Sequence, residues 1–127
     1  MIIYRKGKEK IEIELVARPG CSLYQVRWSN LSVSHAVKTG PVEDSVRCHA
    51  SGDCPPDAVK KPTDNVNKVL VVDEAKSKLI VCGSVQQGIC TRYSLGNISQ
   101  GQPAPIQVAV AANDANSSTY AFVGPQR

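Results

Sequence analysis

The sequence is short of aromatic residues and of long hydrophobic runs. Only 5% of its residues are aromatic, whereas 42% are hydrophobic and 20% charged, which is typical of a globular protein with one modest core. No run approaches the roughly 20 apolar residues that cross a bilayer, so no transmembrane segment is predicted. The amino-terminal stretch MIIYRKGKEK lacks the apolar run of about 7 to 15 residues that defines a signal peptide, so none is predicted either.

Motifs of catalysis and cofactor binding are also missing. The sequence has no GxSxG, no phosphate-cradling glycine loop and no paired carboxylates at a fixed spacing. Cys48 and His49 are adjacent, so their side chains are expected to point apart, whereas a nucleophile and its base converge from separate positions. We therefore predict no enzymatic activity, no catalytic residue and no cofactor or metal site.

The charge pattern argues against nucleic-acid binding. The net charge is +4, and the amino-terminal basic cluster is interleaved with Glu9 and followed by Glu12 and Glu14. Only Tyr4 lies near these cations, and nucleic-acid grooves need stacking aromatics beside the basic residues. We interpret the cluster as a solvated face, and we predict no contact with nucleic acid or with a membrane.

The strongest pattern lies in residues 63–90, TDNVNKVLVVDEAKSKLIVCGSVQQGIC. β-Branched residues occur at both alternate sets of positions in Val66–Asp73, which predicts an interior strand packed on two faces. Residues 73–78 are too few and too polar for a stable helix, and Leu79–Val81 then resumes the apolar pattern. The stretch is therefore predicted to form a β-hairpin.

Two cysteines follow this hairpin at a spacing that a disulfide can close. Cys82 and Cys90 enclose a segment in which Gly83 and Gly88 free the backbone to turn. Closing this ring would remove unfolded-state entropy worth about 2.5 kcal/mol. A disulfide is predicted here, and two buried free thiols are the alternative.

The other cysteines also favour an oxidising compartment. The chain has five cysteines and no CxxC. Cys48 and Cys54 enclose HASGD, a short ring that a second disulfide would close, which leaves Cys21 over. A zinc site built on Cys48, His49 and Cys54 is disfavoured because structural zinc ligands usually come in pairs about two to four residues apart. Three N-x-S/T triplets, at Asn30, Asn97 and Asn116, are candidate glycosylation sites of an extracellular protein.

The remaining segments read as short strands separated by turns. Strands are predicted at residues 11–15, 23–28, 31–37, 90–95, 106–112 and 119–123, in addition to the central hairpin. Residues 39–62 show no periodicity and are predicted to be a long loop, which a disulfide between Cys48 and Cys54 would hold in shape. Seven or eight strands and no helical periodicity indicate an all-β antiparallel meander.

Several segments resemble the start of a plexin Sema domain. They are LYQVRWSNLSV, TGPVEDSVRCHASGDCPPD, PTDNVNKVLVVDEAKSKLIVCGSVQQGIC and VAANDANSSTYAFVGP, in that order, and together they cover about residues 23–127. Residues 1–22 do not resemble the family's sequence. They are assigned as a separate amino-terminal segment, either a strand or disordered. Both cysteine pairs match local disulfides of the family.

The resemblance implies about the first two blades of a seven-bladed β-propeller, an incomplete Sema domain spanning residues 23–127. It further implies a glycosylated semaphorin receptor on the extracellular side of the plasma membrane, which acts in axon guidance and cell adhesion by signal transduction. Semaphorins would bind through the complete ectodomain, and other plexin chains are further candidate partners. The alternative is a truncated structural or interaction fragment without receptor activity.

Overall fold

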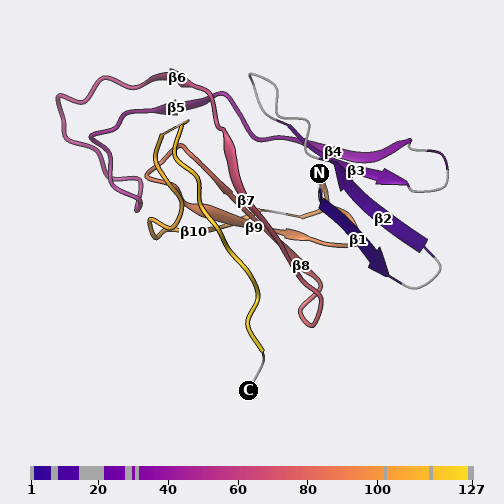
Figure 1. Cartoon of the computed structure of the whole chain (residues 1–127). Coiled ribbons are helices and arrows are strands. Elements are labelled where there is room, and N and C mark those ends of the chain that lie inside the picture. The colour runs from indigo at the N-terminus through magenta and orange to yellow at the C-terminus, as the bar shows by residue number, and fades with distance from the viewer. Residues whose placement is uncertain are drawn as a thin grey trace.

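The computed structural model describes residues 2–6, 9–14, 22–27, 30, 32–101, 103–114 and 116–125. These residues form strands, turns and bends and contain no helix, so the all-β prediction is confirmed (Figure 1). Their strands are β1 (Ile2–Lys6), β2 (Glu9–Glu14), β3 (Ser22–Arg27), β4 (Val33–Lys38), β5 (Val42–Asp44), β6 (Lys61–Thr63), β7 (Asn67–Asp73), β8 (Lys78–Gly83), β9 (Cys90–Ser94) and β10 (Ala104–Ile106).

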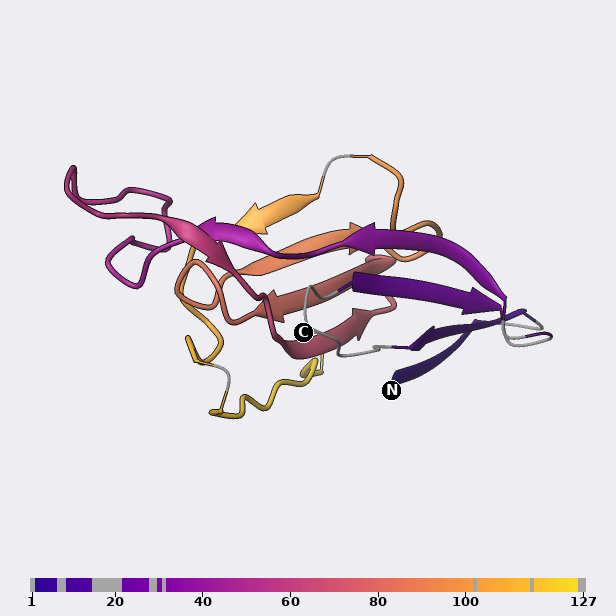
Figure 2. The same ribbon diagram turned by 90° about the horizontal axis from the view of Figure 1, so that it is seen from above.

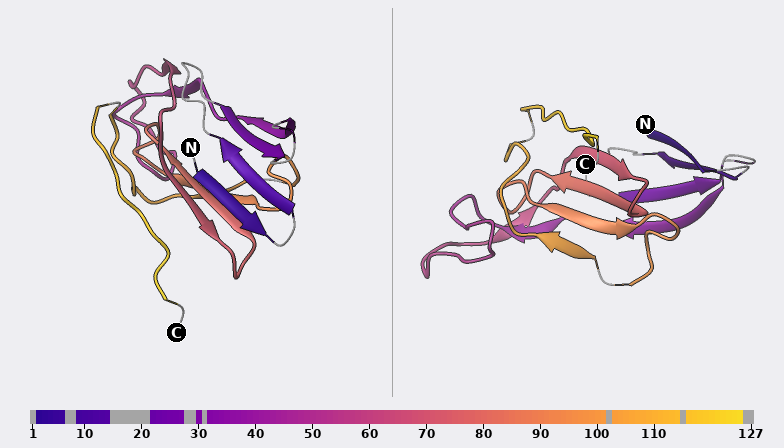
Figure 3. Two further views of the ribbon diagram at one scale, coloured as in Figure 1. Left: turned by 45° about the vertical axis from the view of Figure 1, so that its right-hand side comes forward. Right: turned by 90° about the horizontal axis from the view of Figure 1, so that it is seen from below.

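The larger strands form two antiparallel meanders. The first sheet has the order β1-β2-β3-β4, and the second has the order β10-β9-β8-β7. Every pairing within these two sheets joins strands that are consecutive in the sequence and antiparallel. The first sheet lies on one face of the second, and the carboxyl-terminal segment runs along the opposite side (Figures 2 and 3). The predicted antiparallel meander is therefore present twice.

The apolar residues of β7 are divided between the two faces of the second sheet. Leu70 belongs to the main core, which joins the two sheets, and Val72 packs against that core. Val69 belongs to a smaller cluster on the opposite face, against which Val71 packs. This division follows from the two-residue period of a strand. The prediction that this strand packs on two faces is confirmed.

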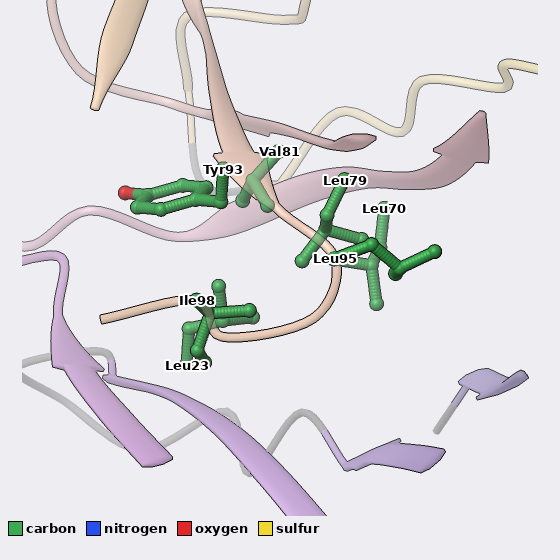
Figure 4. Packing of buried hydrophobic residues seen from close by; sticks show 7 residues of the cluster. All are labelled: Leu23, Leu70, Leu79, Val81, Tyr93, Leu95 and Ile98. Carbon is green, nitrogen blue, oxygen red and sulfur yellow. The ribbon is translucent and has the colours of Figure 1, made fainter. Parts of the chain in front are cut away.

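The main core forms where the first sheet meets the second. Leu23 of β3 reaches across to the second sheet, and both Leu23 and Leu79 have no exposed surface. The buried members of this core, shown in Figure 4, are Leu23, Leu70, Leu79, Val81, Tyr93, Leu95 and Ile98. Leu95 and Ile98 come from the turn after β9, so this turn fills the space between the sheets.

Three predictions about strands are wrong. The strand β7 is not interior, since among the described strands it pairs only with β8 and lies at the edge of its sheet. Residues 107–112 are not a strand, because the N–H groups of Val110 and Ala111 both donate to the carbonyl of Gly88 instead of to a neighbouring strand. Residues 119–123 also lie outside every described sheet, although their residue types favour a strand.

The predicted long loop is closed at its base. Its two ends form the short strands β5 and β6, which pair from Val42 opposite Thr63 to Asp44 opposite Lys61. Periodicity could not reveal such short strands, because a strand of three residues gives no measurable alternation. The predictions at residues 11–15, 23–28 and 31–37 correspond to β2, β3 and β4, whereas β1 was not predicted.

Candidate functional site: the interlocked disulfide loops

Both predicted cysteine pairs are joined in the structure. Cys82 and Cys90 face each other on the neighbouring strands β8 and β9, and their side chains form a disulfide. Cys48 and Cys54 form the second disulfide, in the loop between β5 and β6. The sulfurs of Cys48 and Cys54 are therefore unavailable to a nucleophile or to a zinc ion, which removes the alternatives based on them. Cys21 lies outside the described residues.

The loop closed by Cys82 and Cys90 has an unusual backbone at its tip. Gln86 and Gln87 have φ angles of 53° and 62°, in the left-handed region that non-glycine residues seldom adopt. Gly88 follows with a φ of 74°, and a Cβ at this position would overlap the backbone of Ala111. Such conformations persist only where the surroundings hold them in place.

The holding contacts come from the other disulfide loop. The N–H of Gln86 donates to Asp44 Oδ2 at 2.8 Å. Gln87 Nε2 donates to the carbonyls of Val46 and Cys48 at 2.8 and 2.9 Å. The tip of one disulfide loop is thus hydrogen bonded to the segment that enters the other. We call residues 44–54 and 82–90 the interlocked loops.

Side chains from further along the chain complete this arrangement. Asn113 Nδ2 donates to Gln87 Oε1 at 2.9 Å, so both the oxygen and the nitrogen of the Gln87 side-chain amide form hydrogen bonds. Gln107 Nε2 donates to the carbonyl of Ser51 at 3.1 Å. The interlocked loops are therefore held together by hydrogen bonds from several segments of the chain. The sequence did not predict these contacts, because a glutamine or asparagine in a loop does not indicate which residues its side chain will contact.

An exposed ion pair links one of the interlocked loops to the segment that follows it. Arg47 and Asp57 form a two-bond ion pair with both N–O distances at 3.1 Å, and both side chains are at least half exposed. An exposed pair of this kind contributes at most about 1 kcal/mol. Within the described ranges, no three His, Cys, Asp or Glu side chains are grouped so as to hold a metal ion. None of the described residues forms a helix that is long and apolar enough to cross a membrane.

A buried glutamine joins the two sheets beside the main core. Gln25 is 2% exposed, and its Nε2 donates to the carbonyls of Leu95 and Gly96 at 3.0 and 3.4 Å. Its Oε1 accepts the N–H of Ile98 at 3.3 Å and lies 2.9 Å from His35 Nδ1. Because Gln25 Oε1 can only accept, the Nδ1 of His35 carries the proton. His35 thus has a structural partner instead of a catalytic one.

A cavity of about 360 Å³ is lined by residues of β4, β7, β8 and β9 and of the loops around them. Its lining includes Tyr93, Asn65 and Asn67, and burial raises the pKa of the Tyr93 phenol. Asn65 Nδ2 donates to the carbonyl of Thr39 at 2.9 Å. The Oδ1 of Asn65 and the Oδ1 and Nδ2 of Asn67 are buried and have no hydrogen-bond partner among the described residues.

The three candidate glycosylation sites differ in local geometry. Asn30 Oδ1 accepts both the N–H and the hydroxyl of Ser32, at 3.1 and 2.7 Å. Asn97 Oδ1 accepts the corresponding groups of Ser99 at 3.0 and 2.6 Å. The two triplets therefore form the same type of turn at different places in the chain. Asn30 is exposed and Asn97 is half-buried.

The third triplet begins at Asn116, which is exposed and lies in a turn centred on Asp114. The Ser117 hydroxyl, the Ser117 N–H and the Asn116 N–H donate to the Asp114 carboxylate and hold its pKa below the usual value, with a further contribution from the charge of Lys68. The turn is therefore fixed by the carboxylate of Asp114, and Asn116 contributes its backbone.

Disulfide-closed loops on an all-β antiparallel scaffold are typical of a module of an extracellular protein. No protein-family model matches it. Plexin A3 of Danio rerio is 39% identical over 82 residues, which cover 59% of this chain, and Plexin-B1 of Homo sapiens is 39% identical over 101 residues, which cover 73%. The chain belongs to the plexin family.

The structural comparison agrees with the sequence comparison. The solved structure of the full extracellular region of plexin A4 superposes with a TM-score of 0.56 at 29% sequence identity, over 72% of this chain. The match covers 11% of the plexin A4 chain and 4% of the length of the two curated relatives named above. This chain therefore corresponds to a small part of a plexin extracellular region.

Proposed function

We propose that this chain is the opening part of a Sema domain, comprising about the first two blades of a seven-bladed propeller. The observation that carries the proposal is the four-stranded antiparallel meander β7–β10, which packs through the main core against a second antiparallel sheet to which residues 23–127 contribute β3 and β4. Four-stranded antiparallel sheets are the units that propellers repeat around their axis. Residues 23–127 would supply the propeller strands, and residues 1–22 would stand outside the family pattern.

In this proposal the receptor recognises semaphorins through its complete ectodomain on the extracellular face of the plasma membrane. Its signalling role in axon guidance and cell adhesion would then belong to the whole receptor. The interlocked loops support the extracellular assignment, because disulfides persist in oxidising compartments. This part of the receptor would provide surface for binding, and other plexin chains are further candidate partners.

The test is a chimera in which residues 23–127 replace the matching segment of the Plexin-B1 extracellular region. Cell-surface display is measured with an antibody to a later domain, and binding is measured with purified semaphorin ectodomains. We expect the chimera to be displayed and to bind a semaphorin. The matched control carries Cys82→Ser and Cys90→Ser and should lose display, since the loop that holds β8 to β9 is opened. A well-displayed chimera that binds none of the semaphorins would contradict the proposal.

We further propose glycosylation at Asn30, Asn97 and Asn116. The side-chain contact between the asparagine and the serine hydroxyl supports this at Asn30 and Asn97, and exposure supports it at Asn116. Protein secreted from eukaryotic cells should lose one glycan mass for each Asn→Gln replacement, as measured by intact mass spectrometry. Unchanged mass after treatment with a peptide N-glycosidase would refute the assignment.

A further inference from the structure

The interlocked loop of residues 82–90 contacts a further segment of the chain, residues 110–113. The carbonyl of Gly88 accepts the N–H groups of Val110 and Ala111 at 3.1 and 2.9 Å. Ala111 is buried and belongs to the same hydrophobic cluster as the disulfide of this loop. The two segments are so close that a Cβ on Gly88 would overlap the backbone of Ala111. The position of residues 110–113 therefore depends on the conformation of this loop.

The tip of that loop, residues 85–88, depends in turn on the other interlocked loop. Three consecutive residues of the tip have positive φ angles, and two of them are glutamines, which adopt such angles only where their surroundings hold them. The N–H of Gln86 donates to Asp44, whose side chain is buried. The side chain of Gln87 donates to two backbone carbonyls of the other loop. These hydrogen bonds hold the tip in its left-handed conformation, and they cross from one loop to the other.

The loop that provides these acceptors is itself closed mainly by its disulfide. Between Cys48 and Cys54 the backbone forms only tight turns, in which the N–H of His49 donates to the carbonyl of Asp53 and the N–H of Gly52 donates to the carbonyl of His49. The other disulfide joins β8 to β9, which are also held together by their strand pairing. Turns open locally at a lower free energy than the strands of a sheet. Reduction is therefore expected to open the Cys48–Cys54 disulfide first.

We propose that the Cys48–Cys54 disulfide is a redox-sensitive switch that sets the position of residues 110–113 through the tip of the neighbouring loop. When this disulfide opens, the two carbonyls that Gln87 binds are no longer held in place. The tip then leaves its left-handed conformation and releases residues 110–113, while the second sheet stays paired. The switch consists of contacts within this chain and does not depend on semaphorin recognition.

The reaction that opens the switch is thiol–disulfide exchange with a dithiol. One thiolate of the dithiol attacks a sulfur of the Cys48–Cys54 bond and forms a mixed disulfide, and the other protein sulfur leaves as a thiolate. The second thiolate of the dithiol then attacks its own sulfur in the mixed disulfide and displaces the remaining protein sulfur. The protein gains two electrons and two protons as two thiols, and the dithiol is oxidised to its intramolecular disulfide.

The first experiment removes the disulfide by Cys48→Ser with Cys54→Ser, in a Cys21→Ser background that prevents thiol exchange. Hydrogen–deuterium exchange of the full chain is followed by NMR. The amide of Ala111 should exchange at least about tenfold faster, since each hydrogen bond lost changes the opening equilibrium by a factor of several. The amides that pair β7 with β8 should keep their rates. The matched control Arg47→Ala breaks the exposed ion pair of the same loop and should change neither set of rates.

Three outcomes of this experiment would overturn the proposal. They are an unchanged rate at Ala111 after removal of the disulfide, an equal increase in the Arg47→Ala control, and an equal increase in the strand amides of β7 and β8.

A second variant tests the route with both disulfides closed. Gln87→Ala removes the side-chain hydrogen bonds to the other loop and should raise the exchange rate at Ala111 by a similar factor. Adding this change to the chain without the Cys48–Cys54 disulfide should raise the rate little further, because both changes remove the same contacts. Factors that simply multiply would contradict the route through Gln87, and so would a Gln87→Ala chain that exchanges like wild type.

The third experiment uses a reductant directly. The Cys21→Ser chain is treated with increasing dithiothreitol, and the opened cysteines are identified by alkylation and mass spectrometry. The amide of Ala111 should lose protection over the concentrations that open Cys48–Cys54, while Cys82–Cys90 is still closed. In the control chain without the Cys48–Cys54 disulfide, the same concentrations should leave the exchange rate at Ala111 constant. Opening of Cys82–Cys90 first, or release of Ala111 only when Cys82–Cys90 opens, would refute the switch.

Discussion

Replacing Gln25 with leucine should destabilise the protein far more than an ordinary polar-to-apolar change on a strand. Leucine removes a side chain that bridges the first sheet to the turn after β9. The carbonyl of Leu95 and the N–H of Ile98 then lose their partner, and both residues are 2% exposed, so water cannot replace the glutamine. Each buried unsatisfied group costs about 1 to 3 kcal/mol.

The expected loss for Gln25→Leu is therefore about 2 to 5 kcal/mol, part of the cost being offset by the added apolar surface. The assay is urea unfolding followed by intrinsic fluorescence, with the slope of the transition checked for two-state behaviour. The control is Gln107→Leu, because Gln107 also makes one side-chain bond to a carbonyl but does so at the exposed surface. It should cost less than about 1 kcal/mol. Equal losses for the two variants would refute the idea that Gln25 acts as a buried bridge.

Three further predictions concern substitutions in the second sheet. Removing the Cys82–Cys90 disulfide by double serine replacement should lower the free energy of unfolding by about 2.5 kcal/mol, measured in the same urea assay, and no loss would contradict the ring-closure argument. Gly83→Ala should destabilise the fold, because the added Cβ would overlap the side chain of Asn65, and thermal unfolding unchanged from wild type would contradict this overlap. Burial raises the pKa of Tyr93, so its contribution to stability is present below the unfolded value of 10.0 and is lost as the pH rises through the folded pKa. Tyr93→Phe should reduce that alkaline loss in unfolding curves recorded from neutral to alkaline pH.

Hydrophobic periodicity located most of the larger strands, because the alternation of side chains between the two faces of a strand depends only on residues that are near one another in the sequence. The alternating residues of β7 pack on two faces, as their pattern predicts, and the cysteine spacing of the hairpin predicts the disulfide between β8 and β9. The pattern failed at residues 107–112 and 119–123. A strand requires a hydrogen-bonding neighbour as well as suitable residues, and a neighbour is a property of the whole fold.

The candidate site was predictable only in part. The spacing of Cys48 and Cys54 indicated a closed loop, and the structure contains that disulfide. The contact of Gln87 with the segment entering the other loop was not predictable. It joins residues about forty positions apart, and an amide side chain forms equally good hydrogen bonds with many carbonyls.

The sequence by itself determined the all-β class, the positions of the larger strands and the two short disulfide rings, because each depends on residues that are near one another along the chain. The tertiary structure alone decided that β7 stands at an edge, that Gln25 bridges the sheets and that the two disulfide loops brace each other. These features depend on which distant segments meet, and that choice is made by packing the whole core at once.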